Sequence, residues 1–144
     1  MFSPVPDVEL VIRILLAVGL GGLIGTEREA HDRPAGLRTH ILVCVGATLF
    51  TIVSISFTGA GIDPTRVAAG IVTGIGFLAA GAIFKAENHV HGLTTAADIW
   101  VIAAIGLAIG IGYYSAAILS AIVVFLIIVA GRKIKERLGK KDLG

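Results

Sequence analysis

The stretch Gly19-Leu-Gly-Gly-Leu-Ile-Gly25-Thr-Glu-Arg-Glu-Ala30-His-Asp-Arg-Pro-Ala35-Gly-Leu-Arg-Thr-His40 decides the fold. It holds the end of one apolar segment, a charged bend and the start of the next apolar segment. Its glycines let helices pack closely before the bend, and charges crowd the bend itself. A weaker echo follows 56 residues later, so the sequence predicts a small bundle built around two bends.

The composition indicates an all-α integral membrane protein. The 144 residues are 56% hydrophobic and 15% charged, and the mean hydropathy is +0.92. A soluble domain of this size has too little interior to hide so much apolar surface. The single cysteine, Cys44, lies inside an apolar run, which indicates a packing residue and excludes a disulfide framework.

About five transmembrane helices are expected, because a bilayer core takes roughly 20 apolar residues per helix. The runs lack the alternation of β-strands, and a helix satisfies its own backbone hydrogen bonds in lipid. The acidic flank before the first run, Asp7 and Glu9, indicates a retained helix rather than a signal peptide. The expected helices cover about 8–26, 39–58, 66–84, 94–112 and 114–131 of a domain at 1–131, and a basic cytoplasmic tail at 132–144 extends the last one.

The basic residues predict the orientation. With five spans, ten of them fall on one side of the membrane and Arg66 alone on the other, which places the N-terminus outside and the C-terminus in the cytoplasm. Arg13 lies inside the first span and either snorkels to the outer surface or pairs with another segment. The ten are Arg28, Arg33, Arg38, Lys85, Arg132, Lys133, Lys135, Arg137, Lys140 and Lys141.

An internal repeat is indicated by a shift of 56 residues, which aligns Gly36-Leu37 with Gly92-Leu93 and Thr39 with Thr95. Helices one and two would then form a hairpin parallel to that of helices three and four, with helix five added. Chance matching in a chain rich in glycine, alanine and valine is the competing explanation. A true repeat would place two helix N-termini side by side at the cytoplasmic face, and membrane sites often form at such interfaces.

Small residues recur at the spacing that lets two helix backbones approach closely. We expect them to pack helices, either within the bundle or between subunits of a homodimer. No Gly-Lys-Ser/Thr follows any of them, which argues against nucleotide binding. The three pairs are Gly21 and Gly25, Gly70 and Gly74, and Gly106 and Gly110.

Asp98 is the most informative single residue, because an acid inside a membrane helix costs roughly 2.5–3.5 kcal/mol and by default suggests function. The structural alternative is an ion pair with Arg28 or Arg38. Arg38 beside two helix N-termini would favour an anion or a carboxylate. The candidate functional cluster comprises Glu27, Arg28, Arg38, Thr39, Thr94, Thr95 and Asp98.

Other chemistry is not indicated. His31 and His40 also lie near the bends, and the spacing of His89 and His91 with Glu87 is too loose for us to predict a metal site. No nucleophile–base pair is convincing, so we expect no enzyme and no cofactor. The basic tail is explained by topology and by contact with anionic lipid, so nucleic-acid binding is not expected.

Several motifs together resemble the MgtC/SapB family over about residues 10–112. The first half carries Gly-Thr-Glu27-Arg28-Glu29 and Gly36-Leu37-Arg38-Thr39-His40 at a specific spacing. The second half carries Gly74-Ile-Gly-Phe-Leu78, Gly81-Ala-Ile83, Gly92-Leu-Thr-Thr-Ala-Ala97 and Trp100. The family's Glu-Arg pair matches Glu27 and Arg28, and its acidic residue matches Asp98.

The resemblance implies a multi-pass protein of the prokaryotic cytoplasmic membrane, linked to survival at low magnesium and, in pathogens, to growth inside macrophages. It favours a non-enzymatic regulator of membrane partners such as ATP synthase or cation transporters. The alternative is a small transporter or channel for Mg²⁺ or another charged solute, in which an oligomer supplies a ring of Asp98 side chains. Many members add a soluble domain after the helices, and we expect this chain to act through its membrane core, alone or with a partner.

Overall fold

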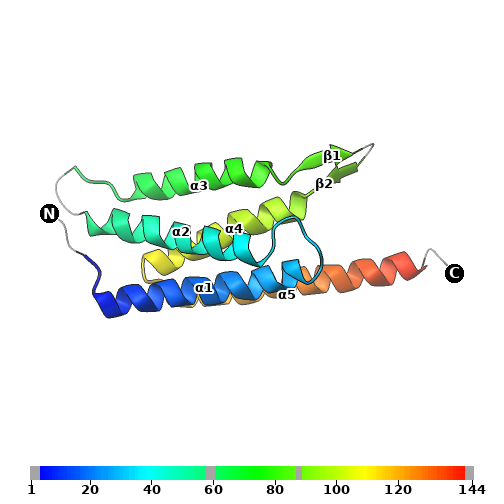
Figure 1. Ribbon diagram of the computed structural model, residues 1–144, viewed down its shortest axis with the longest axis horizontal. Coiled ribbons are helices and arrows are strands. Elements are labelled where there is room, and N and C mark those ends of the chain that lie inside the picture. Colours follow the sequence, from blue (N-terminus) through cyan, green and yellow to red (C-terminus); the bar gives the residue numbers. More distant parts are fainter. Residues whose placement is uncertain (1–3, 58–60, 87–88, 142–144) are drawn as a thin grey trace.

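The computed structural model describes residues 4–57, 61–86 and 89–141, and it confirms an all-α membrane-protein fold (Figure 1). Two short strands, β1 and β2, form an antiparallel hairpin that is not expected from the sequence. The elements in chain order are α1 (Asp7–Glu29), α2 (Leu37–Ser56), α3 (Thr65–Ala80), β1 (Phe84–Ala86), β2 (His89–His91), α4 (Leu93–Gly110) and α5 (Tyr114–Lys141).

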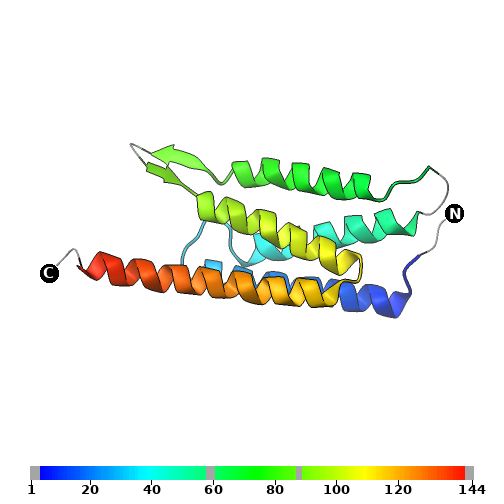
Figure 2. The ribbon, with the colours of Figure 1, turned by 180° about the vertical axis from the view of Figure 1, so that it is seen from behind.

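The helices lie in three layers, with α3 on one side, α2 and α4 in the middle, and α1 and α5 on the other side (Figures 1 and 2). Within the described ranges, α1, α2, α4 and the Tyr114–Ile134 part of α5 are long and apolar enough to cross a membrane. Isoleucines of α4 fill the centre of the bundle and pack against alanines of α1 and α5. The buried helix α4 is therefore the one best placed to hold a polar site away from lipid and water.

Helix α3 is shorter than predicted. Its 16 residues correspond to about 24 Å, less than the roughly 30 Å of a bilayer core. The predicted span at 66–84 was wrong at its end, because the chain leaves the helix at Gly81 and enters the hairpin at Phe84. Strand pairing of Phe84–Ala86 with His89–His91 replaces the last helical turn.

The ends of the other helices also differ from the expected ones. Helix α1 continues to Glu29, and α2 and α4 begin at Leu37 and Leu93, which lie 56 positions apart as the repeat predicts. The preceding glycines differ in conformation, because φ is −109° at Gly36 and +84° at Gly92. Helix α5 continues through the predicted basic tail to Lys141, and 142–144 lie outside the described residues.

Two of the three glycine pairs bring α2 into backbone contact with its neighbours. A β-carbon on Gly25 of α1 would lie 2.8 Å from the Cα of Leu37. A β-carbon on Gly106 of α4 would overlap the carbonyl oxygen of Cys44, and one on Gly110 would lie 2.8 Å from the carbonyl oxygen of Thr48. Helix α2 is thus held between α1 and α4 at a separation that only glycine permits.

The third pair behaves differently. Gly70 and Gly74 lie on an exposed face of α3, and a β-carbon on either would meet nothing within 4 Å in this part of the structure. This face does not pack within the bundle. A homodimer formed through it remains a prediction.

Arg13 pairs with other segments, so of the two alternatives for this residue the structure favours pairing over snorkelling. Its Nη1 donates to the carbonyl oxygen of Gly110 at 2.5 Å, and its Nε donates to the hydroxyl of Tyr114 at 3.2 Å. Glu9 accepts from the same guanidinium at 3.1 Å. Because Gly110 ends α4, the guanidinium is also stabilised by the negative end of that helix dipole. Through these contacts Arg13 joins α1 to α4 and α5.

We predict that Gly106→Ala destabilises the protein by about 1–3 kcal/mol, because the added methyl group must push α2 away from α4. Gly70→Ala is the matched control, and its effect should be neutral or stabilising by up to about 1 kcal/mol, because the site is open and alanine favours helix. The free energy of unfolding in mixed micelles measures both. Equal losses of unfolding free energy in the two variants would show that Gly106 is no more closely packed than Gly70.

Candidate functional site

A buried ion pair joins α1 to α4. The Nε atom of Arg28 lies 2.9 Å from Oδ2 of Asp98, and both side chains are more than nine-tenths buried. Thr95, one turn before Asp98, accepts a hydrogen bond from Nη2 of Arg28 at 3.2 Å. The three residues form a neutral polar site at the point where α1 ends and α4 begins.

Local sequence explains this geometry. Thr95 and Asp98 are three positions apart on α4, so they share one face and stand one above the other. Asp98 lies near the N-terminus of its helix, where the backbone dipole favours an acid. Arg28 is in the last turn of α1, and the glycines of that helix bring it close to the bundle centre.

Glu29 has a different role, because its carboxylate caps the next helix. Its Oε2 atom accepts a hydrogen bond from the backbone N–H of Leu37 at 2.8 Å, across the bend. A β-carbon on Gly36 would overlap that same oxygen, so a larger residue there would displace the Glu29 carboxylate from the helix start. The negative carboxylate at the start of α2 also complements the helix dipole.

Glu27 faces α5 instead of α4. Its Oε1 atom pairs with Arg132 and lies 3.4 Å from Nδ1 of His31. The Oε2 atom of Glu27 is buried and has no hydrogen-bond partner within the described residues. Consecutive residues of the Glu27-Arg28-Glu29 motif therefore tie α1 to α5, to α4 and to α2.

His40 is fully buried at the interface of α1 and α2. Its Nδ1 lies 2.9 Å from the carbonyl oxygen of Gly36, and its β-carbon lies against Gly25. Its Nε2 has no hydrogen-bond partner in the part of the chain that the structure describes. An imidazole is thus enclosed at the start of α2, at a residue outside the predicted cluster.

Besides Glu27, three members of the predicted cluster lie apart from the ion pair. Arg38 and Thr39 line an open polar pocket of about 450 Å³ on the charged bend, together with Glu29, Asp32 and Arg33. Thr94 is exposed at the start of α4. Of the two arginines considered for Asp98, Arg28 is the partner, and Arg38 lies at the open pocket instead.

Metal ligands are not gathered anywhere in the described ranges, since no group of three His, Cys, Asp or Glu residues converges there. His89 and His91 belong to β2, and His91 stacks on Phe84 with ring centroids 5.3 Å apart. Glu87, the third residue considered, lies outside the described residues.

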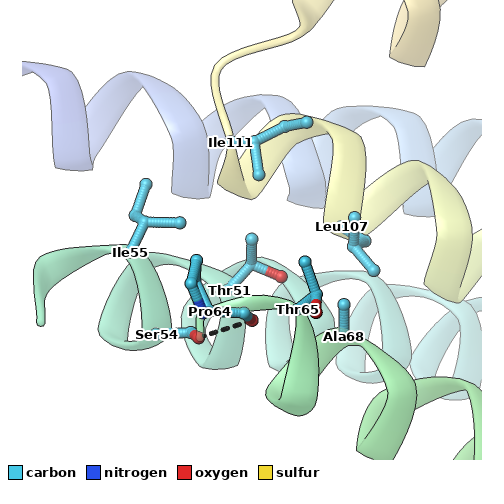
Figure 3. A pocket seen from close by; sticks show the side chains of 8 residues that line it. All are labelled: Thr51, Ser54, Ile55, Pro64, Thr65, Ala68, Leu107 and Ile111. Atoms are coloured by element: carbon cyan, nitrogen blue, oxygen red, sulfur yellow. Dashed lines mark hydrogen bonds between the residues drawn. The ribbon is translucent and has the colours of Figure 1, made fainter. Parts of the chain in front are cut away.

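An apolar pocket of about 250 Å³ lies between α2, α3 and the end of α4, at the end of the bundle far from the bends (Figure 3). The hydroxyls of two residues in its wall are already bonded, since Ser54 donates to the carbonyl oxygen of Pro64 at 2.9 Å and Thr51 donates to that of Ala47 at 2.7 Å. The pocket therefore offers hydrocarbon to an occupant and is unsuited to an ion.

Comparison with known proteins gives consistent matches. A model of the MgtC family matches residues 14–137. The "Putative magnesium transporter YhiD" of Escherichia coli K12 is 43% identical over 93% of this chain and 66% of its own length. "Protein MgtC" of Brucella abortus is 50% identical over 75% of this chain and 45% of its own length. "Protein MgtC" of Salmonella typhimurium is 40% identical over 90% of this chain and 55% of its own length. The chain spans about half to two thirds of these relatives, and no solved structure matches it significantly.

We predict that Arg28→Leu and Asp98→Leu each destabilise the protein by about 3–5 kcal/mol, because each leaves one buried charge without its partner. The double variant Arg28→Leu/Asp98→Leu should recover most of that loss, since no lone charge remains. Thermal unfolding in detergent compares the three. Additive losses in the double variant would show that the two charges do not act as a pair.

Proposed function

The chain belongs to the MgtC family, and we propose that it is a non-enzymatic membrane regulator that supports adaptation to low magnesium. Its action would pass through membrane partners such as ATP synthase or a cation transporter. The observation that supports this proposal best is the Arg28–Asp98 pair. It gives the bundle a neutral, enclosed polar centre in place of a free acid.

The ion pair favours regulation over Mg²⁺ coordination for a chemical reason. Mg²⁺ requires near-octahedral oxygen coordination and gives up its water reluctantly. Asp98 is in contact with a guanidinium at 2.9 Å, and a cation would have to displace that group first. A buried pair that joins two helices is better suited to fix their relative position.

The proposed orientation follows from the end of the bundle that carries the bends, here named the basic end. Arg28, Arg33, Arg38, Lys85, Arg132 and Lys133 lie in the segments that meet there, while Arg66 starts α3 at the other end (Figure 1). We place the basic end in the cytoplasm, in accord with the positive-inside rule. Four apolar helices and bacterial relatives support a multi-pass bacterial membrane protein.

The second candidate is a small transporter or channel for Mg²⁺ or another charged solute. It is favoured by the name of the YhiD relative, a putative magnesium transporter, and by the position of Asp98 inside a spanning helix. In that mechanism the charged bend would admit the solute, and Arg28 would release Asp98 when the solute arrives.

One experiment separates the two candidates. The protein and its Asp98→Asn variant are produced in a bacterium that lacks its own MgtC-family gene and is grown at low Mg²⁺, and the same proteins are tested for Mg²⁺ uptake in proteoliposomes. We expect growth to depend on Asp98, because the variant loses the charge that holds Arg28. We expect uptake no greater than that of protein-free vesicles.

Asp63→Asn is the matched control, since it makes the same change in an exposed acid at the far end of the bundle. Hydrogen bonds from Thr65 lower the pKa of Asp63, so it is ionised under the assay conditions and its loss is a true loss of charge. Saturable uptake that Asp98→Asn abolishes and Asp63→Asn retains would establish transport and overturn the regulator. Equal growth of all three strains would remove Asp98 from the proposed site.

A further inference from the structure

The hairpin of β1 and β2 is an exposed extension of the fold. It projects from the basic end beyond α2 and α3 (Figures 1 and 2). All six strand residues are exposed, and the strands pair Phe84 with His91, Lys85 with Val90 and Ala86 with His89. Its base is fixed, because Gly92 adopts a left-handed conformation in which a β-carbon would overlap the carbonyl oxygen of Ala82.

An isolated hairpin of this size is not expected to be stable in water, because two-stranded hairpins are marginal without a third strand or an apolar surface to pack on. Here the side chains that would need such a surface are apolar and uncovered. Phe84 and Val90 are each 54% exposed, and Leu93, just after the hairpin, is 58% exposed. The hairpin therefore requires a covering layer that is not supplied by the rest of the described bundle.

This apolar exposure continues from the outer surface of α3. Phe77 and Leu78 near the end of that helix are 82% and 58% exposed, and Ile83 and Phe84 follow after the turn. Helix α3 covers only about 24 Å of a roughly 30 Å core. If its start lies at the far surface, its end lies below the surface at the basic end, and the hairpin falls at that surface. The outer edges of a two-stranded hairpin carry backbone groups that hydrocarbon excludes and the headgroup layer accepts.

We propose that the hairpin lies in the phospholipid headgroup layer, with Phe84 and Leu93 against the upper acyl chains and Lys85, on the opposite face of the hairpin beside Val90, at a phosphate. The hairpin would thus complete the membrane contact that the short α3 leaves unfinished. The assignment does not depend on the proposed regulatory function. It rests on the length of α3, on the exposure of these side chains and on the marginal stability of the bare hairpin.

The chain has one tryptophan, Trp100, so Trp100→Phe gives a background without tryptophan fluorescence. Phe84→Trp in this background is placed in nanodiscs of mixed zwitterionic and anionic phospholipid without any other protein. Phe77→Trp serves as the reference within the bilayer, and N-acetyltryptophanamide serves as the reference in water. Acrylamide quenches tryptophan fluorescence from the water side. Quenching from the membrane side is measured with three nitroxide-labelled lipids, which carry the nitroxide at the headgroup, at a shallow position of the acyl chain or at a deep one.

We expect acrylamide to quench the Phe84→Trp protein several-fold less than the free compound, and headgroup or shallow nitroxides to quench it more than deep ones. The Phe77→Trp protein should be quenched more by deep nitroxides than by those at the headgroup. Acrylamide quenching of the Phe84→Trp protein at the level of the free compound would overturn the proposal and leave a protein partner as the covering surface.

A charge variant tests the contact with phosphate. Lys85→Glu, added to the Phe84→Trp protein, should increase its quenching by acrylamide, because a carboxylate is repelled by phosphate. Lys133→Glu makes the same change in charge on α5, away from the hairpin, and should leave that quenching unchanged. Equal effects of the two charge variants would overturn the role given to Lys85.

Discussion

The close approach of α2 to α1 and α4 is the constraint on which the rest of the structure depends. Glycines on both neighbours let backbone meet backbone, and no side chain fits between them. In a bilayer this packing replaces the hydrophobic effect that holds a soluble core, because lipid is as apolar as the helix surfaces. The same approach brings the end of α1 within reach of α4, so the polar pair depends on the apolar packing around it.

The fold class could be predicted because hydropathy and length carry it, and so could the positions of the two bends. The polar partner of Asp98 could not be chosen between Arg28 and Arg38, because that depends on how α1 is rotated about its axis. The pairing of Arg132 with Glu27 could not be predicted, because the two residues are 105 positions apart in the chain. The hairpin could not be predicted because Ile83 and Phe84 continue the apolar run of α3. Phe84 becomes part of a strand only through its pairing with His91, which lies later in the chain.

The Glu27-Arg28-Glu29 motif illustrates how a short charged sequence organises a membrane bundle. Three consecutive residues on a helix point in directions about 100° apart, so each can meet a different neighbour. Here they contact α5, α4 and the start of α2. Three neighbouring charges therefore link four helices to one another. The proposed regulatory role, which depends on the relative position of the helices, builds on these contacts.

The unbroken course of α5 gives the molecule a mechanical property. Its 28 residues form a rod of about 42 Å, from the turn after α4 to a point beyond the other helices. Arg132 meets α1 partway along this rod, while Tyr114 is bonded to Arg13 at its far end. We therefore expect a sideways force on the projecting end to tilt α5 about its contact with α1, and so to shift the start of the helix, where Tyr114 contacts Arg13.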